Sequence, residues 1–274
     1  PESRRHQCVR SSSAHRATPH STLAHGLVHP SHTTAHRRFG GRTEVRMTIG
    51  LAFFHGWGLS RRFWQPLAAA LPDHPHAYFD AGYTGEPATP DYDLATQWVA
   101  VGHSLGWAHA LQNPPPGGWL GMVSLSGFTH FCAHAPGDPG QAKRVVERMV
   151  RVFERTPQAV LQDFLTRCQL AELMPEEDPP LHMGRLHHDL HRLIDIDVNP
   201  LLAELSAPVL ALAAQDDVIV PPELTASIFE SHNNTTLTWR ADGGHALGYV
   251  HANWCAQQIQ PFIHNLPHGQ TTHR

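Results

Sequence analysis

The sequence GHSLG at residues 102–106 comes directly after the apolar run WVAV at residues 98–101 and before a helix-compatible stretch that ends near Gln112. A serine between two such glycines lies on a tight strand-to-helix turn, because glycine removes the side chains that would clash there. Its hydroxyl group then projects from the carboxyl end of the strand. The five letters alone also fit an ordinary glycine turn, but their place between a strand and a helix predicts that Ser104 is a nucleophile.

Two groups that would activate this serine follow later in the chain. A serine hydroxyl needs an imidazole to accept its proton and a carboxylate to orient that imidazole. His245 lies in a glycine-rich loop, DGGHA at residues 242–246, which can direct its ring toward the sheet edge. The apolar run at residues 208–214 is followed by Gln215 and two aspartates, of which we favour Asp217 as the orienting carboxylate, with Asp216 as the alternative. If neither has this role, both only cap the helix that follows.

The stretch HGWG at residues 55–58 follows the first apolar run of the chain and adds a further element to the same site. We predict that the backbone N–H groups of Trp57 and Leu105 converge on the negative oxygen that develops during acyl transfer. Each such donor is worth about 3 to 4 kcal/mol. A glycine turn that only reverses the chain is the alternative, but it leaves the ordered series of four matching elements unexplained.

The whole chain from Thr48 onward shows short apolar runs that alternate with helix-like stretches. This alternation is typical of an α/β fold with a mostly parallel sheet covered by helices. An insertion at residues 139–203 is helical by its period and has no strand pattern, so we predict a helical lid. Residues 47–138 and 204–274 then form the core. The predicted strands are residues 49–54, 77–80, 98–102, 121–126, 208–214 and 235–239, and the predicted core helices are residues 60–70, 106–112, 222–230 and 246–264.

Residues 1–46 differ from everything that follows, being rich in Ser, Thr, Arg and His and having no apolar period. We leave them out of the fold, as a disordered extension or as non-native sequence translated ahead of a start at Met47. A transit peptide is the alternative, since arginine and serine are frequent and acids few, but an amphipathic apolar face is missing. The scattered histidines have no spacing that defines a metal site.

The composition is that of a globular protein, with 41% hydrophobic and 16% charged residues in a chain of 274. A formal net charge of −4 gives no reason to expect nucleic acid or an anionic membrane as a partner. No apolar run approaches the roughly 18 residues of a spanning helix, and no signal-peptide segment is visible. The cysteines form no C-x-x-C pair, which favours a soluble protein of the reducing cytoplasm; they are Cys8, Cys132, Cys168 and Cys255.

From about Ile49 to Phe262 the chain resembles the α/β-hydrolase superfamily, and within it the pimeloyl-[acyl-carrier-protein] methyl ester esterases of biotin synthesis. The residues that carry the match are 55–58 with Phe63 and Trp64, 102–106, 124–128 and 217–221. The resemblance implies an α/β-hydrolase fold and a serine carboxylesterase that works through an acyl-enzyme, with no metal and no organic cofactor. It also implies site residues: a triad of Ser104, Asp217 and His245, oxyanion donors at Trp57 and Leu105, and substrate-binding side chains at Phe128 and Phe164.

Two features depart from the family pattern. The stretch from Tyr83 to Trp98 is too short for the usual helix with two loops, which predicts that one sheet-covering helix is missing or reduced. Trp107 replaces the small residue common after the nucleophile turn, which would reshape the floor of the pocket. Both departures bear on the identity of the substrate more than on the type of reaction.

The predicted lid carries a basic ridge on one helical face, formed by Arg144, Arg148, Arg151 and Arg155. The apolar side chains Val145, Val146, Met149, Val152 and Phe153 fall opposite, so the helix is amphipathic. Acyl carrier proteins are acidic, and a basic ridge beside the active-site mouth would dock one and raise its encounter rate. The alternative is a solvated helix face, since Glu147 and Glu154 flank the arginines.

Four histidines form a further cluster in the lid, at positions 182, 187, 188 and 191. His187 and His191 have the i, i+4 spacing of a helical metal pair, but no carboxylate base stands between them as in H-E-x-x-H. A solvent-facing helix is the interpretation we favour.

The function predicted from these residues is hydrolysis of an acyl ester, with a pimeloyl-carrier-protein methyl ester as the substrate that the resemblance suggests. A general short-chain carboxylesterase or thioesterase is the alternative within enzymes. A non-catalytic ligand-binding protein of the same fold is the alternative from another class, and the intact set of three triad residues weighs against it.

Overall fold

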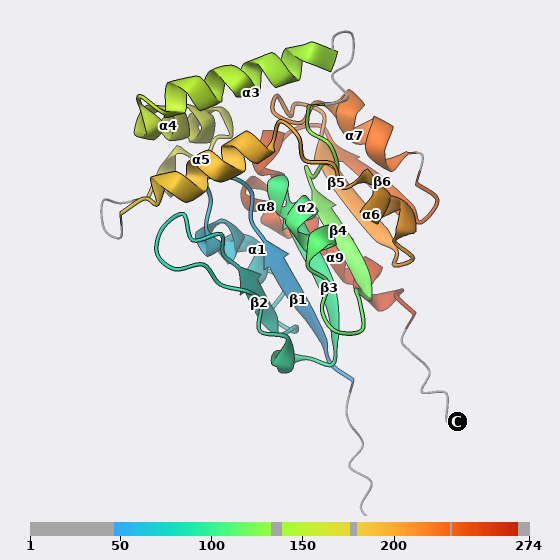
Figure 1. Ribbon diagram of the computed structural model, residues 1–274. Coiled ribbons are helices and arrows are strands. Elements are labelled where there is room, and N and C mark those ends of the chain that lie inside the picture. The colour runs from blue at the N-terminus through green and yellow to red at the C-terminus, as the bar shows by residue number, and fades with distance from the viewer. Residues whose placement is uncertain (1–46, 133–138, 176–179, 231, 268–274) are drawn as a thin grey trace, which may run out of the picture. The chain divides into compact units, whose positions relative to one another are not determined.

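The computed structural model describes residues 47–132, 139–175, 180–230 and 232–267. The expected N-terminal extension, residues 1–46, lies outside this part of the chain, as does Cys8. The described residues build one parallel sheet with the strand order β2-β1-β3-β4-β5-β6. The predicted α/β fold with a parallel sheet is confirmed (Figure 1).

The strands lie close to where the apolar runs predicted them, because a strand buried on both faces of a sheet must be apolar along its whole length. In β3 every residue after the first is buried, and in β5 all are. The edge strand β6 is only partly buried, and its sequence TTLTWR alternates accordingly. The bounds are β1 Ile49–Phe54, β2 His76–Phe79, β3 Gln97–His103, β4 Gly121–Leu125, β5 Val209–Ala214 and β6 Thr235–Arg240.

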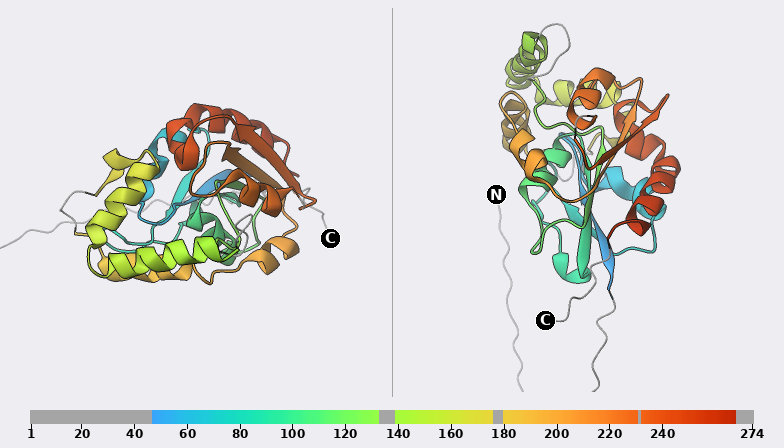
Figure 2. Two further views of the ribbon diagram at one scale, coloured as in Figure 1. Left: turned by 90° about the horizontal axis from the view of Figure 1, so that it is seen from above. Right: turned by 90° about the vertical axis from the view of Figure 1, so that its right-hand side faces the viewer.

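Helices cover both faces of the sheet, as Figure 2 shows for α2 and α6 on one face and α1 and α9 on the other. The ring of Trp107 in α2 lies 5.8 Å from the ring of Phe229 in α7, so these two helices share a face. The covering helices are α1 Gln65–Ala69, preceded by a 3₁₀ turn Arg61–Trp64, α2 Leu105–Gln112, α6 Asn199–Glu204, α7 Pro222–Phe229, α8 Leu247–Val250 and α9 Ala252–His264.

One predicted helix, residues 246–264, is in fact two, because α8 ends before His251 and α9 begins after it. His251 has non-helical backbone angles, φ −117° and ψ 41°, and its Nε2 atom lies 3.4 Å from a carboxylate oxygen of Asp242. This contact ties the break to the loop that precedes His245.

Between β2 and β3 the chain has no α-helix; residues 80–96, all described, contain a 3₁₀ turn at Tyr92–Leu94 and isolated β-bridges, one of which pairs Asp80 with Ala88. The predicted loss of one covering helix is therefore confirmed. Aromatic side chains take its place: the ring of Tyr92 lies 5.4 Å from that of Trp98 and 6.1 Å from that of Trp119. The Trp98 indole N–H donates to the Tyr92 carbonyl at 3.1 Å, which satisfies a polar group that would otherwise be buried alone.

The insertion between β4 and β5 supplies α3, α4 and α5, which lie over the carboxyl ends of the strands (Figure 1). Buried apolar residues at helical spacing hold α3 in place: Val146, Val150 and Phe153. The sequence placed Val145 and Val152 on the same apolar face, but they are 53% and 41% exposed. The bounds are α3 Pro139–Phe153, α4 Pro157–Arg167 and α5 Met183–Arg192, with a 3₁₀ turn at Ala171–Leu173.

The strand order also fixes where a site can form. From β1 the chain runs to β2 on one side, then crosses back to β3 on the other side of β1. The loops after β1 and β3 therefore leave in opposite directions and open a crevice at the carboxyl ends of these two strands. Residues 55–58 follow β1 and Ser104 follows β3, so both border this crevice.

Candidate active site

Ser104 occupies a strained turn between β3 and α2. Its backbone angles, φ 54° and ψ −126°, are rare for a residue with a side chain, and such strain persists only where the surrounding structure enforces it. The Ser104 amide donates to the Leu125 carbonyl at 3.1 Å, and its own carbonyl accepts from the Trp107 amide at 3.0 Å. These bonds fix the turn, and Ser104 is 6% exposed.

The glycines on either side of the turn are required by close backbone approaches. A Cβ atom on Gly102 would lie 2.6 Å from the Cα of Trp107, and one on Gly106 would overlap the carbonyl oxygens of Phe54 and His55. Helix α2 thus packs its first turn directly on the end of β1. The G-x-S-x-G pattern has a physical cause here, because any larger residue at 102 or 106 would push the turn at Ser104 away from the sheet.

His245 and Asp217 meet at the same edge of the sheet. The Nδ1 atom of His245 lies 3.0 Å from one carboxylate oxygen of Asp217, and both side chains are buried. The other Asp217 oxygen accepts the amides of Ile219 and Val220, each at 2.9 Å. The carboxylate is therefore held by the chain on one side and holds the imidazole on the other.

The alternative carboxylate, Asp216, has a different position. Its side chain accepts the backbone N–H of Gly244 at 2.8 Å and makes no contact with the His245 ring among those found in the structure. Gly243 and Gly244 have positive φ values, 120° and 52°, which glycine adopts without strain. Asp216 thus anchors the glycine loop that carries His245, while Asp217 contacts the ring itself.

The electrostatic surroundings keep Asp217 ionised. Burial would raise its pKa, but the nearby His245 and the amides of Val220 and Ile219 act in the opposite direction and outweigh it, so that the pKa of Asp217 lies below its ordinary value. An anion at this point stabilises a positive charge on the neighbouring imidazole.

The second nitrogen of His245, Nε2, is buried and has no hydrogen-bond partner within the part of the chain that the structure describes. The structure has no hydrogen bond between this atom and Ser104. The two residues are nevertheless neighbours in the fold, since the ring of His103, next to Ser104, bonds the backbone carbonyl of His245 at 2.8 Å. Nε2 is thus the ring atom left available for a reacting hydroxyl group.

The loop after β1 passes directly against the turn at Ser104. A Cβ atom on Gly56 would lie 3.0 Å from the Cβ of Ser104, so only glycine fits. His55 holds this loop: its Nε2 accepts the Ala81 amide at 3.1 Å and its Nδ1 donates to the Gly56 carbonyl at 2.9 Å. No acceptor for the Trp57 amide is found among the described residues, and the Leu105 amide, at the start of α2, has no acceptor within the helix.

A cavity of about 600 Å³ opens above Ser104. Its wall combines residues from the sheet edge and from the inserted helices, and the predicted substrate-binding residues Phe128 and Phe164 both belong to it. Trp57, Phe131, Met149 and Val160 add further apolar surface. Charged groups come from α3 and α4: Arg148, Asp163 and Arg167. The cavity suits an apolar chain with a polar group at one end.

The inserted helices also support the loop that carries Trp57. The indole N–H of Trp57 donates to the Leu186 carbonyl in α5 at 2.8 Å. Its ring lies 5.1 Å from that of Phe164 in α4 and 6.1 Å from that of Phe153 in α3. Phe164 in turn lies 6.4 Å from the His245 ring. Three helices of the insertion are thus packed on the loop and on the imidazole.

The four arginines proposed from the sequence as a docking ridge are all exposed, but only Arg144, Arg148 and Arg151 lie on α3, because the helix ends at Phe153 and Arg155 follows it in a turn. They do not all face the cavity: Arg148 lines it, whereas Arg151 lines a separate shallow hollow with Glu147, His191 and Asp195. Val145 and Val152, half exposed, lie at the cavity between the ridge and the buried side of the helix. The mouth therefore has an apolar rim beside Arg148.

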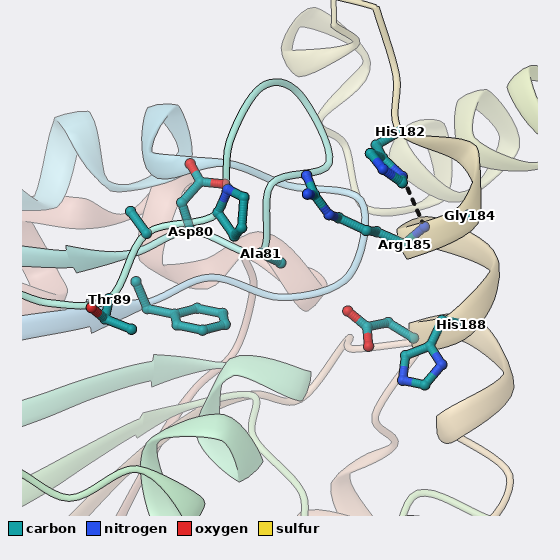
Figure 3. Close-up of a pocket in the computed structure, with 11 residues that line it drawn as sticks. Asp80, Ala81, Thr89, His182, Gly184, Arg185 and His188 are labelled. Atoms are coloured by element: carbon teal, nitrogen blue, oxygen red, sulfur yellow. Dashed lines mark hydrogen bonds between the residues drawn. The ribbon is translucent and has the colours of Figure 1, made fainter.

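A second hollow, of about 510 Å³, lies between the end of β2 and the start of α5 (Figure 3). It contains both signs of charge, and several of its polar groups have partners within the fold. Arg185 donates to the Gly82 and Gly85 carbonyls, His182 accepts the Arg185 amide, and Asp80 accepts the Gly82 amide. The hollow has no nucleophile beside a base, and we assign the site to the cavity at Ser104.

The four lid histidines, at positions 182, 187, 188 and 191, do not form a metal site. Within the described residues no group of three or more His, Cys, Asp or Glu side chains is placed to hold a metal ion. His187 instead lies 3.6 Å from Glu154, and His182 caps α5. No helix in the described part of the chain combines the length and the apolar character needed to cross a bilayer.

Two histidines near the site carried no signal that sequence reasoning used. The HGWG and GHSLG motifs assign no separate role to His55 and His103. Both are buried, and both bond backbone carbonyls of the site. Their hydrogen bonds could have been suspected from burial alone, because a polar ring between two apolar strands needs a partner.

Comparison with known proteins agrees with this geometry. No family model matches the chain. It is 26% identical to the pimeloyl-[acyl-carrier protein] methyl ester esterase of Xylella fastidiosa (strain M23), over 79% of this chain and 96% of that protein. It is 25% identical to the biotin biosynthesis bifunctional protein BioHC of Cellvibrio japonicus (strain Ueda107), over 79% of this chain, and spans only 48% of that longer protein.

Among solved structures, an esterase from Exiguobacterium antarcticum aligns with a TM-score of 0.67 at 15% identity, covering 80% of this chain and 93% of that one. Identity at this level speaks for the fold alone. By its strand order and these comparisons, the chain has the α/β-hydrolase fold and is similar in sequence to the pimeloyl-[acyl-carrier protein] methyl ester esterases.

Proposed function

We propose that this α/β-hydrolase is a carboxylic ester hydrolase in which Ser104 forms an acyl-enzyme, with His245 as the base and Asp217 as its orienting carboxylate. One observation carries the proposal: a buried Asp217–His245 pair, at 3.0 Å, lies beside a strained serine that opens into an apolar cavity. The strain, the buried anion and the cavity serve no evident structural purpose together.

In the first half of the reaction, Nε2 of His245 accepts the Ser104 hydroxyl proton while Oγ attacks the ester carbonyl carbon. The carbonyl oxygen becomes an oxyanion, which the Trp57 and Leu105 amides bind. The imidazolium formed on His245 is stabilised by Asp217. It then returns its proton to the departing alkoxide, which leaves as an alcohol and leaves the acyl group on Ser104.

In the second half, a water molecule takes the place of the alcohol. His245 removes one of its protons as the oxygen attacks the acyl carbon, and the same two amides bind the new oxyanion. Collapse of this intermediate expels Ser104 Oγ, which regains its proton from His245. The products are a carboxylic acid and the free enzyme.

For the substrate we propose the methyl ester of a pimeloyl group carried by an acyl carrier protein. The relatives named above support this choice, and so does the shape of the site. The apolar cavity would accept the acyl chain, and the arginines on α3 lie where an acidic carrier would approach. Arg148, at the cavity itself, is the member of the ridge best placed to act on binding.

The test compares two substrates: pimeloyl-carrier-protein methyl ester, and a p-nitrophenyl ester of a short acid, which has no carrier protein. We expect turnover of both, and loss of both in Ser104→Ala. Reversing two ridge charges, Arg148→Glu with Arg151→Glu, should raise the Michaelis constant for the carrier ester far more than that for the small ester.

A matched control reverses two exposed arginines outside α3, Arg61→Glu with Arg62→Glu, which changes the net charge by the same amount. If both double variants weaken the carrier ester equally, the ridge has no specific role. Turnover of the small ester without turnover of the carrier ester would instead favour a general short-chain esterase. Binding of acyl esters without any turnover would favour a non-catalytic receptor.

A further inference from the structure

His103 precedes the nucleophile and lies at the end of β3, 1% exposed. Its ring is stacked on Phe63 with centroids 4.3 Å apart and lies 4.8 Å from the ring of His245. Its Nε2 atom is 2.8 Å from the backbone carbonyl oxygen of His245, 142 residues further along the chain. One imidazole thus joins the nucleophile turn to the loop of the base.

The hydrogen bond fixes which nitrogen carries the proton when this ring is neutral. A carbonyl oxygen only accepts, so Nε2 of His103 carries the proton and Nδ1 does not. Nδ1 is buried without a partner among the described residues and faces the oxyanion loop, since a Cβ on Gly56 would lie 2.9 Å from it. Burial, and then the nearby His245, lower the pKa of His103 to about 3, which keeps the ring neutral at ordinary pH.

We propose that His103 is a positioning residue, which holds the His245 carbonyl through its Nε2–H and thereby sets the place of the His245 ring relative to Ser104. The role rests on the function proposed above for Ser104 and His245. Asp217 restrains the ring of His245 from one side, and Asp216 restrains the loop at Gly244. His103 supplies the remaining restraint, on the backbone of residue 245 itself, directly from the segment that carries the nucleophile.

A neutral ring is suited to this task. During the reaction His245 becomes positively charged, and a second positive charge on a ring 4.8 Å away would oppose that step. Among the described residues no carboxylate pairs with His103, and together with the burial of its ring this keeps the positive charge on His245 alone. Phe63 and Trp64, which pack on the His103 ring, contribute to that burial.

Two substitutions separate positioning from packing. His103→Phe keeps a ring against Phe63 but has no donor, whereas His103→Gln keeps an N–H donor near the Nε2 position but loses the ring. If the hydrogen bond positions His245, His103→Phe should lower kcat for a p-nitrophenyl ester by about 100-fold with KM unchanged, because a small misplacement of a catalytic group costs this much. His103→Gln should recover most of that loss.

The measurement reports kcat, KM and the rate of fluorophosphonate labelling at Ser104, with thermal unfolding for each variant. Packing alone predicts the reverse order, with the phenylalanine variant more active than the glutamine variant. That order, or equal kcat in all folded variants, would overturn the proposal. Wild-type enzyme that neither turns over ester nor is labelled at Ser104 would instead refute the proposed function. Failure of the positioning role and failure of the proposed function are therefore distinguished by the activity of the wild-type enzyme.

Discussion

Replacement of Asp217 by asparagine tests the orienting carboxylate with almost no change in shape. In the structure one Asp217 oxygen accepts the Ile219 and Val220 amides at 2.9 Å, and the other contacts Nδ1 of His245 at 3.0 Å. An asparagine must keep its oxygen toward the two amides, because its NH₂ group there would face two donors. Its NH₂ group therefore points at His245.

This arrangement forces the wrong tautomer of the base. With a donor facing Nδ1, His245 must carry its proton on Nε2, which then has no lone pair to accept the Ser104 proton. The imidazolium also loses its buried anion. In a serine protease the same replacement lowers kcat by about 10⁴-fold, equivalent to about 5.5 kcal/mol, and we expect a loss of this size for Asp217→Asn.

The assay is steady-state hydrolysis of a p-nitrophenyl ester, with Asp216→Asn as the matched control. The Asp216 carboxylate accepts the Gly244 amide, and an asparagine oxygen can still accept that bond, so the kcat of Asp216→Asn should stay within about tenfold of wild type. Equal losses in the two variants, or an Asp217→Asn enzyme that keeps a tenth of its activity, would refute the assignment.

The remaining predictions concern stability and the cavity. Because the pKa of Asp217 lies below its ordinary value in the fold, its charge stabilises the folded state above about pH 4, and this contribution is lost on acidification. Urea unfolding should therefore show that wild type loses more stability than Asp217→Asn between about pH 6 and pH 3. Parallel curves of unfolding free energy against pH would contradict this. Gly106→Ala should cost at least about 3 kcal/mol, since its Cβ overlaps two carbonyl oxygens, whereas Gly184→Ala, with 3.5 Å to its nearest neighbour, should be neutral; equal melting temperatures would refute the packing argument. Phe164→Ala should lower kcat/KM about tenfold for a hexanoate ester, because it removes a cavity wall that also packs on Trp57 and His245. An unchanged ratio of hexanoate to acetate turnover would show that Phe164 does not contact the acyl chain of the substrate.

The sheet was predictable because its central strands, β1, β3, β4 and β5, are buried on both faces. Each such strand needs an unbroken apolar run, and β1 was predicted with both ends correct. The glycine motifs were predictable for a related reason: Gly102 and Gly106 are demanded by backbone approaches that admit no other residue. The nucleophile turn and its place beside β1 therefore follow from local sequence.

Contacts between distant segments were harder to predict. The choice between Asp216 and Asp217 depends on which carboxylate turns inward, and that is decided by the Ile219 and Val220 amides. The bond from His103 to residue 245 spans 142 positions and leaves no periodic trace in the sequence. The exposure of Val145 and Val152 was missed because hydrophobic periodicity does not distinguish a buried helix face from the rim of a cavity.

The most direct measurement of the central claim is covalent labelling by a fluorophosphonate, followed by mass analysis of the modified peptide. We expect one adduct per chain, on Ser104, formed rapidly in wild type, far more slowly in His245→Ala and not at all in Ser104→Ala. An adduct on another residue, or labelling of Ser104 at the same rate without His245, would contradict it.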